Sequence, residues 1–88
     1  MNRADEPALA LSQGPYVVRR TETGFWVIWQ TSVKTTGGIL LREAGTGTFR
    51  TCWMVNDAGE IYGDSLDHWV CVQGLKPANA YEVRVFRR

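Results

Sequence analysis

The chain has 88 residues, of which 44% are hydrophobic and 22% are charged. This is the composition of one globular domain with a single core, and it excludes a disordered segment. Its formal net charge of +1 at pH 7 is too small for a protein whose main partner is a polyanion, so we expect no nucleic-acid partner.

The first 13 residues predict a flexible N-terminal tail. They begin with polar residues, and the apolar run from Ala8 to Leu11 is too short for a signal core or a membrane span. We therefore expect no membrane span and a soluble protein, cytoplasmic as the sequence is given. It would be extracellular or periplasmic if a leader had been removed.

Short strands separated by turn residues follow from residue 14 onward. Aromatic and β-branched residues dominate residues 25–31, which predicts a central strand. Asn56 and Gly59 tolerate the left-handed conformations of a hairpin turn. The expected strands before residue 63 are residues 16–20, 25–31, 39–43 and 48–55, with a short one around 60–62; the expected turns are residues 21–24, 35–38, 45–47 and 56–59.

Two further strands surround a corner in the chain. Val70 and Val72 alternate with polar or outward residues, and a second alternating strand opens on Tyr81. Leu75 and Pro77 mark the crossing from one sheet to the other. A tyrosine in this position can bury its ring and hydrogen-bond backbone a few residues upstream, which is the arrangement called a tyrosine corner.

Six or seven strands with a turn about every ten residues predict an all-β sandwich. No segment has the 3.6-residue period of a long helix. The strand that opens on Tyr81 is the last one we expect, so either the final strand of such a sandwich is missing or the early strands are arranged differently. An exposed last strand would invite another chain to pair with it.

The motif order resembles fibronectin type III-like domains, and among them the N-terminal domain of purple acid phosphatases and related metallophosphoesterases. The matching residues lie between about 14 and 86: Gly14-Pro15-Tyr16, the strand ending Val27-Ile28-Trp29-Gln30-Thr31, and His68-x-Val70-x-Val72-x-Gly74-Leu75-x-Pro77-x-x-x-Tyr81-x-x-Arg84-Val85. Trp29, Leu75, Pro77 and Tyr81 form the structural signature. The resemblance implies a fibronectin type III-like, that is immunoglobulin-like, sandwich of two sheets over residues 14–88.

No catalytic or metal-binding constellation is expected, and we predict no cofactor. The phosphoesterase domain that follows such accessory domains uses several Asp, Asn and His ligands to hold two metal ions, whereas this chain has one histidine. His68 is expected to be a structural imidazole at a sheet margin. Ser32 and Ser65 lack a nearby base. Gly63-Asp64 lacks the partners of a metal motif, and the acidic residues Asp57, Glu60, Asp64 and Asp67 do not follow calcium-loop spacing.

Two cysteines, Cys52 and Cys71, lie 19 positions apart with no Cys-x-x-Cys pairing, so neither a zinc site nor a thioredoxin-like motif is indicated. Free, partly buried thiols are expected. A disulfide between neighbouring strands is the alternative, and only geometry decides it.

Apolar residues on the outer face of the sandwich supply the candidate site. If Trp29 is buried, the alternation leaves Trp26 and Ile28 outside, and buried Val70 and Val72 likewise leave Trp69 and Cys71 outside. In a fibronectin-type sandwich these strands are neighbours, so the four outward residues would form one patch, as at a contact surface. The alternative is that loops or the tail, with Leu9 and Leu11, fold over it.

We therefore expect a non-catalytic accessory or scaffold domain that acts through protein contact. Its partner would be a downstream phosphoesterase domain or another copy of itself. The alternative is a carbohydrate-binding or adhesion module that stacks sugars on exposed aromatic residues, namely Trp26, Trp53, Tyr62 and Trp69.

Overall fold

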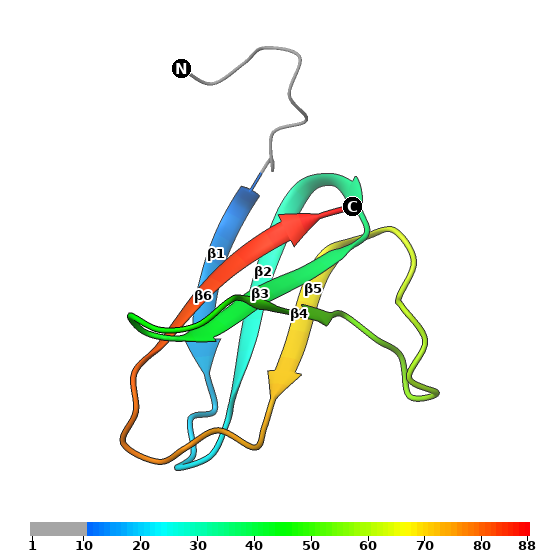
Figure 1. Ribbon diagram of the computed structural model, residues 1–88. Coiled ribbons are helices and arrows are strands. Elements are labelled where there is room, and N and C mark those ends of the chain that lie inside the picture. The colour runs from blue at the N-terminus through cyan, green and yellow to red at the C-terminus, as the bar shows by residue number, and fades with distance from the viewer. Residues whose placement is uncertain (1–10) are drawn as a thin grey trace.

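The computed structural model describes residues 11–88, which form two antiparallel sheets of three strands each, with no helix in that range (Figure 1). The all-β prediction is confirmed, and the two sheets make a β-sandwich. The strands are β1 (Leu11–Val18), β2 (Phe25–Thr35), β3 (Gly37–Glu43), β4 (Arg50–Trp53), β5 (Ser65–Val72) and β6 (Tyr81–Arg87).

The first sheet has the strand order β1-β2-β5, and the second has the order β4-β3-β6. Strands β2 and β3 follow each other in sequence but belong to different sheets, and only Thr36 separates them. The expected break at residues 35–38 is therefore a one-residue crossing. After the crossing, Gly37 permits the close approach of β6, because a Cβ at this position would lie 2.1 Å from the carbonyl oxygen of Phe86.

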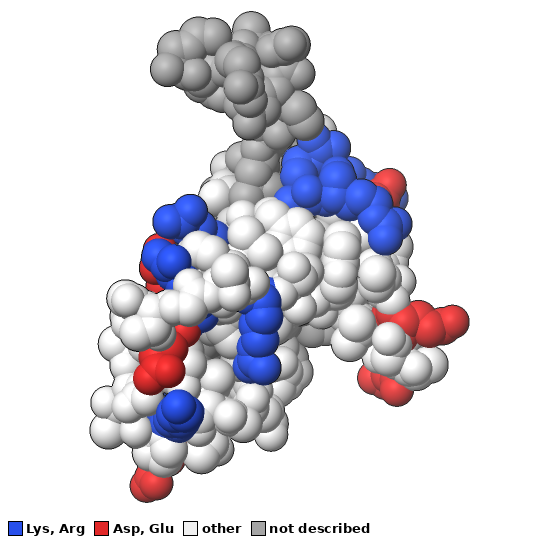
Figure 2. Space-filling model, viewed as in Figure 1, with Lys and Arg blue, Asp and Glu red and all other residues white. Residues whose placement is uncertain are grey.

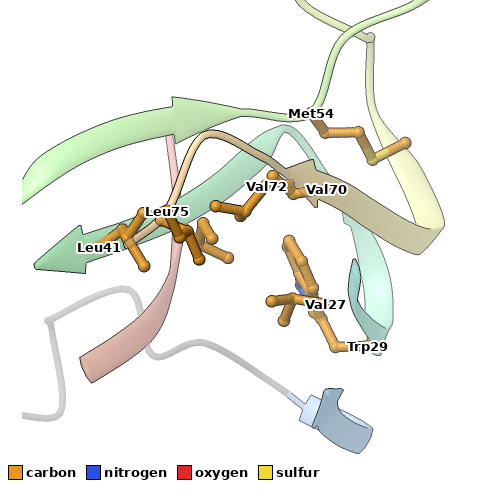
Figure 3. Packing of buried hydrophobic residues seen from close by; sticks show 8 residues of the cluster. Val27, Trp29, Leu41, Met54, Val70, Val72 and Leu75 are labelled. Atoms are coloured by element: carbon orange, nitrogen blue, oxygen red, sulfur yellow. The ribbon is translucent and has the colours of Figure 1, made fainter. Parts of the chain in front are cut away.

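The core lies between the two sheets (Figure 3). Period-two alternation explains it, since every second residue of a strand points to the same face. Val27 is 0% exposed and Trp29 is 3% exposed, whereas Ile28 between them is 36% exposed. The buried hydrophobic cluster consists of Val27, Trp29, Ile39, Leu41, Met54, Val70, Val72 and Leu75.

Several element boundaries differ from the expected ones. Strand β1 begins at Leu11, inside the expected tail, because residues from Leu11 to Val18 pair with β2; residues 1–10 of that tail lie outside the described residues. The expected strand at 60–62 is reduced to one bridge between Val55 and Ile61. The turn between them is present, with Asn56 Oδ1 accepting hydrogen bonds from the N–H groups of Ala58 and Glu60.

The corner between β5 and β6 has the hydrogen bond expected of a tyrosine corner. The Lys76 N–H donates to the Tyr81 hydroxyl oxygen at 2.8 Å. Leu75 is buried in the core while Pro77 is exposed. The Tyr81 ring packs against the core, so one side chain links β6 to the loop that precedes it.

Candidate functional site

The pairing of β2 with β5 places the four predicted interface residues in two adjacent cross-strand pairs. Trp26 lies opposite Cys71, and Ile28 lies opposite Trp69. All four alternate with buried residues of the same strands. They therefore share the outer face of the first sheet, and the half-buried Trp69 also packs against the core cluster.

Strand β1 extends this surface by two residues that sequence reasoning did not identify. Tyr16 lies opposite Ile28, and Val18 lies opposite Trp26. The period-two spacing of Tyr16 and Val18 indicates that both side chains share one face of their strand. Nothing in the sequence indicates, however, that β1 pairs with the edge of β2 opposite to β5. We call the six-residue surface the aromatic patch: Tyr16, Val18, Trp26, Ile28, Trp69 and Cys71.

The aromatic patch has a solvent-accessible centre and partly covered ends. Tyr16 is 52% exposed, whereas both tryptophans are half-buried. The Arg19 guanidinium lies 6.0 Å from the ring centroid of Trp26, and the Tyr62 ring meets Trp69 edge-on at 5.2 Å. The loop that carries Tyr62 therefore covers one end only.

Polar groups border the patch along the strands. The Gln30 side-chain amide donates a 2.7 Å hydrogen bond to Asp67 across β2 and β5. An apolar centre with a polar rim is the usual composition of a protein contact surface. Of the tail residues expected to cover the patch, Leu11 lies in β1 and Leu9 lies outside the described residues.

The four aromatic residues of the expected sugar platform do not come together. Trp53 lies on the outer face of the second sheet, where its ring contacts Phe86 edge-on at 4.9 Å and the Arg88 guanidinium at 5.2 Å. Trp26, Tyr62 and Trp69 lie on the side of the first sheet. Tyr62 and Trp69 are also steeply inclined to each other, with an interplanar angle of 69°, so they do not form one flat surface.

His68 lies on β5, an edge strand of the first sheet, as expected, and its side chain points into the interior beside Trp29, its partner on β2. Its imidazole is 3% exposed and stacks on Trp29 with 5.0 Å between ring centroids. The Nε2 atom lies 3.0 Å from the hydroxyl of Thr31 and 3.3 Å from that of Thr35. Burial disfavours the imidazolium form and lowers the pKa of His68, and this outweighs the opposing effects of the Ser65 carbonyl and Asp67.

Asp64 and Ser65 make ordinary hydrogen bonds. Asp64 accepts a hydrogen bond from the Thr36 hydroxyl, and the Ser65 hydroxyl donates to the Asp67 carbonyl. Within residues 11–88, no three His, Cys, Asp or Glu side chains are grouped closely enough to hold a metal ion.

The two thiols are both free, and they belong to different sheets. Cys52 is half-buried and packs against the core from β4, whereas Cys71 is exposed on the aromatic patch. The alternative, a disulfide between Cys52 and Cys71 on neighbouring strands, is therefore not present in this structure.

Arginines stack on aromatic rings on the outer face of the second sheet. The guanidinium groups of Arg42 and Arg84 lie 4.3 and 4.9 Å from the ring centroid of Phe49. Glu82 binds both arginines, at 2.9 and 3.1 Å, and these hydrogen bonds lower the pKa of its carboxyl. Figure 2 shows basic groups on this face and beside the C-terminus, interrupted by acidic groups. The face is thus partly neutralised rather than uniformly basic.

No protein-family model, curated protein or solved structure matches the chain. No helix in the described part of the chain is long and apolar enough to cross a membrane. The fold and the site therefore define an antiparallel β-sandwich of two three-stranded sheets, with an apolar patch on the outside of the first sheet.

Proposed function

We propose that this protein is a non-catalytic, fibronectin type III-like accessory or scaffold domain, similar to the N-terminal domain of purple acid phosphatases and related metallophosphoesterases. Three features support the fibronectin type III-like assignment. They are the hydrogen bond from Lys76 to Tyr81, the burial of Trp29, and the adjacency of β2 and β5 in one sheet.

The observation that carries the functional proposal is the aromatic patch. Tryptophan and tyrosine bury a large area at a low cost in conformational entropy, and they dominate the binding energy of many protein interfaces. In this protein two tryptophans and a tyrosine lie on the outside of a rigid three-stranded sheet, with Ile28 at their centre. The sheet holds the patch in one shape, so a partner can bind it without ordering a loop.

The partner we propose is a phosphoesterase domain encoded downstream. The reading frame after codon 88 tests this proposal directly. We expect it to contain the Asp-x-His and Gly-Asn-His motifs of a two-metal phosphoesterase. A frame without these motifs would contradict the assignment to the phosphatase group and leave a self-associating scaffold.

A patch variant tests the mode of contact. Ile28→Glu places a charge at the centre of the aromatic patch, and we expect it to weaken binding to the separately expressed downstream domain by at least tenfold in isothermal titration, because an unpaired charge would be buried. Val33→Glu is the matched control, since Val33 is on the same strand, is 57% exposed and lies outside the patch. Equal affinities for the two variants would refute the proposed contact.

A phosphatase assay of the purified 88-residue chain tests whether it has catalytic activity of its own. We expect no hydrolysis of an aryl phosphate in the presence of added divalent metal ions. Turnover by this chain would overturn the proposal. For the carbohydrate-binding alternative, a glycan titration should leave tryptophan fluorescence unchanged, because Trp53 lies on the other sheet and Tyr62 contacts Trp69 edge-on.

A further inference from the structure

The outer face of the first sheet is hollowed between two rows of side chains that cross its strands. Each row takes one residue from β1, β2 and β5: the apolar row is Tyr16, Ile28 and Trp69, and the polar row is Gln13, Gln30 and Asp67. Both rows line an open hollow of about 300 Å³, together with Trp29 and His68, which lie between the rows along β2 and β5. Ligand pockets begin at about this volume, so the hollow suits one side chain of a partner.

Asp67 gives the hollow a negative charge. Its Oδ1 atom accepts the Gln30 amide at 2.7 Å. No lysine or arginine of residues 11–88 lines the hollow or forms an ion pair with Asp67. Both side chains of the Gln30–Asp67 pair are exposed. Within the described part of the chain, no donor bonds to Asp67 Oδ2 or Gln30 Oε1, so two oxygens are open to a donor from outside.

The carboxylate lies close to an aromatic ring. Asp67 and Trp69 are two positions apart on one face of β5, which places their Cα atoms about 7 Å apart. A planar cation that is bonded to the carboxylate can therefore also reach the ring. The Tyr16 ring, which is 52% exposed, lies in the same row as Trp69 on the other side of Ile28. Aromatic rings of this kind attract a cation that lies over their face.

The second sheet already holds an arginine in such surroundings. The Arg42 side chain contacts Glu82 at 2.9 Å, and its guanidinium lies 4.3 Å from the ring centroid of Phe49. A carboxylate beside an aromatic ring thus binds a guanidinium group of the chain itself on that sheet. Asp67 and Trp69 present the same two groups in the hollow, where no described residue supplies the cation.

We propose that the hollow binds an arginine side chain of the protein that docks on the aromatic patch. The guanidinium group donates to Asp67 Oδ2 and Gln30 Oε1 and stacks on the Trp69 ring, while its methylene stem lies against Ile28. Arginine suits the hollow better than lysine, because its planar group forms forked hydrogen bonds and stacks on rings, whereas an ammonium group is compact and strongly hydrated. The proposal rests on the proposed function, since the arginine belongs to the partner of the patch.

A small arginine probe tests the hollow without that partner. N-acetyl-arginine amide is titrated into the isotope-labelled chain, and NMR follows the backbone amides of Gln30 and Asp67 and the indole N–H of Trp69. We expect saturable shifts at these groups, and none from the citrulline analogue, which has a similar shape but no charge. The lysine analogue should bind more weakly. No saturable shift from the arginine probe, or equal binding of any two probes, would refute the proposal.

Two pairs of variants then test the chemistry of the hollow. Asp67→Asn keeps the acceptor for Gln30 but removes the charge, and it should weaken binding of the arginine probe by roughly three- to fivefold, as for an accessible ion pair. Asp57→Asn is the matched control, because Asp57 is exposed in the turn at 56–59 and does not line the hollow. Tyr16→Leu removes a ring and should weaken binding by about two- to fivefold, whereas Tyr16→Phe keeps the ring and should bind as the wild type does.

The charge test is decisive for Asp67, because its carboxylate is exposed and Asn preserves its shape. Equal affinities of Asp67→Asn and Asp57→Asn for the arginine probe would overturn the proposed ion pair. Equal affinities of Tyr16→Leu and Tyr16→Phe would overturn the role of the ring. Circular dichroism of each variant checks that the fold is retained, as expected for substitutions at exposed positions.

The result is separate from the test of the proposed function. If a downstream domain binds the patch and Ile28→Glu weakens that binding, but the arginine probe does not bind, the contact surface stands and the arginine subsite is refuted. If the probe binds as expected and the reading frame lacks phosphoesterase motifs, the hollow stands and the assignment to the phosphatase group fails.

Discussion

The hydroxyl group of Tyr81 makes a contribution to stability that one substitution isolates. Its oxygen accepts the Lys76 N–H at 2.8 Å, while the ring packs against the core. Tyr81→Phe keeps the ring and removes only the acceptor. Lys76 lies in an exposed part of the corner, so a water molecule can accept its N–H hydrogen bond when the tyrosine oxygen is lost. The loss of folding free energy therefore stays close to that of one ordinary hydrogen bond.

We expect Tyr81→Phe to lower the free energy of unfolding by about 1 kcal/mol. For a domain of this size, that corresponds to a decrease in Tm of about 4 to 8 °C. Thermal unfolding followed by circular dichroism measures it directly. Urea unfolding should give the same loss with an unchanged m-value, because the surface buried on folding is nearly the same.

Tyr16→Phe is the matched control for this measurement. Tyr16 is 52% exposed, and its hydroxyl has no hydrogen bond to the described residues. Loss of that hydroxyl should change stability by less than about 0.5 kcal/mol. If the two variants had the same Tm, the hydrogen bond at the corner would not stabilise the fold, and the structural part of the argument for a tyrosine corner would fail.

Two further predictions concern His68 and the thiols. Burial holds the pKa of His68 below its usual value of 6.5, so as pH falls the unfolded chain becomes protonated at this residue before the folded protein does. The contribution of neutral His68 to the free energy of unfolding is therefore fully present above pH 6.5 and is lost as pH falls through the folded-state pKa. His68 is the only histidine, so the decrease in Tm between pH 7.5 and 5.5 should shrink in His68→Gln; an equal decrease would contradict the assignment. For the thiols, a maleimide should modify Cys71 rapidly in the folded protein and Cys52 only slowly, since Cys71 is exposed and Cys52 packs against the core. Mass spectrometry of the labelled peptides measures both rates, and equal rates would refute this difference in burial.

The sequence alone was enough to predict the central strand and the corner, because both depend on local chemistry. Alternation along residues 25–31 correctly separated buried Val27 and Trp29 from exposed Ile28. The spacing from Leu75 to Tyr81 likewise predicted a hydrogen bond between neighbouring parts of the chain. In both cases the deciding interactions lie within a few residues, where residue type and period carry the information.

Tertiary structure decided which strands lie side by side, because strand pairing brings together residues that no local pattern connects. It added Tyr16 and Val18 to the aromatic patch through the pairing of β1 with β2. Strand pairing also places Trp53 on the second sheet and Trp26 on the first, and it places the His68 ring in the interior against Trp29. Alternation assigns each side chain to one of two faces of its strand, but only packing determines whether that face meets the core, another sheet or solvent.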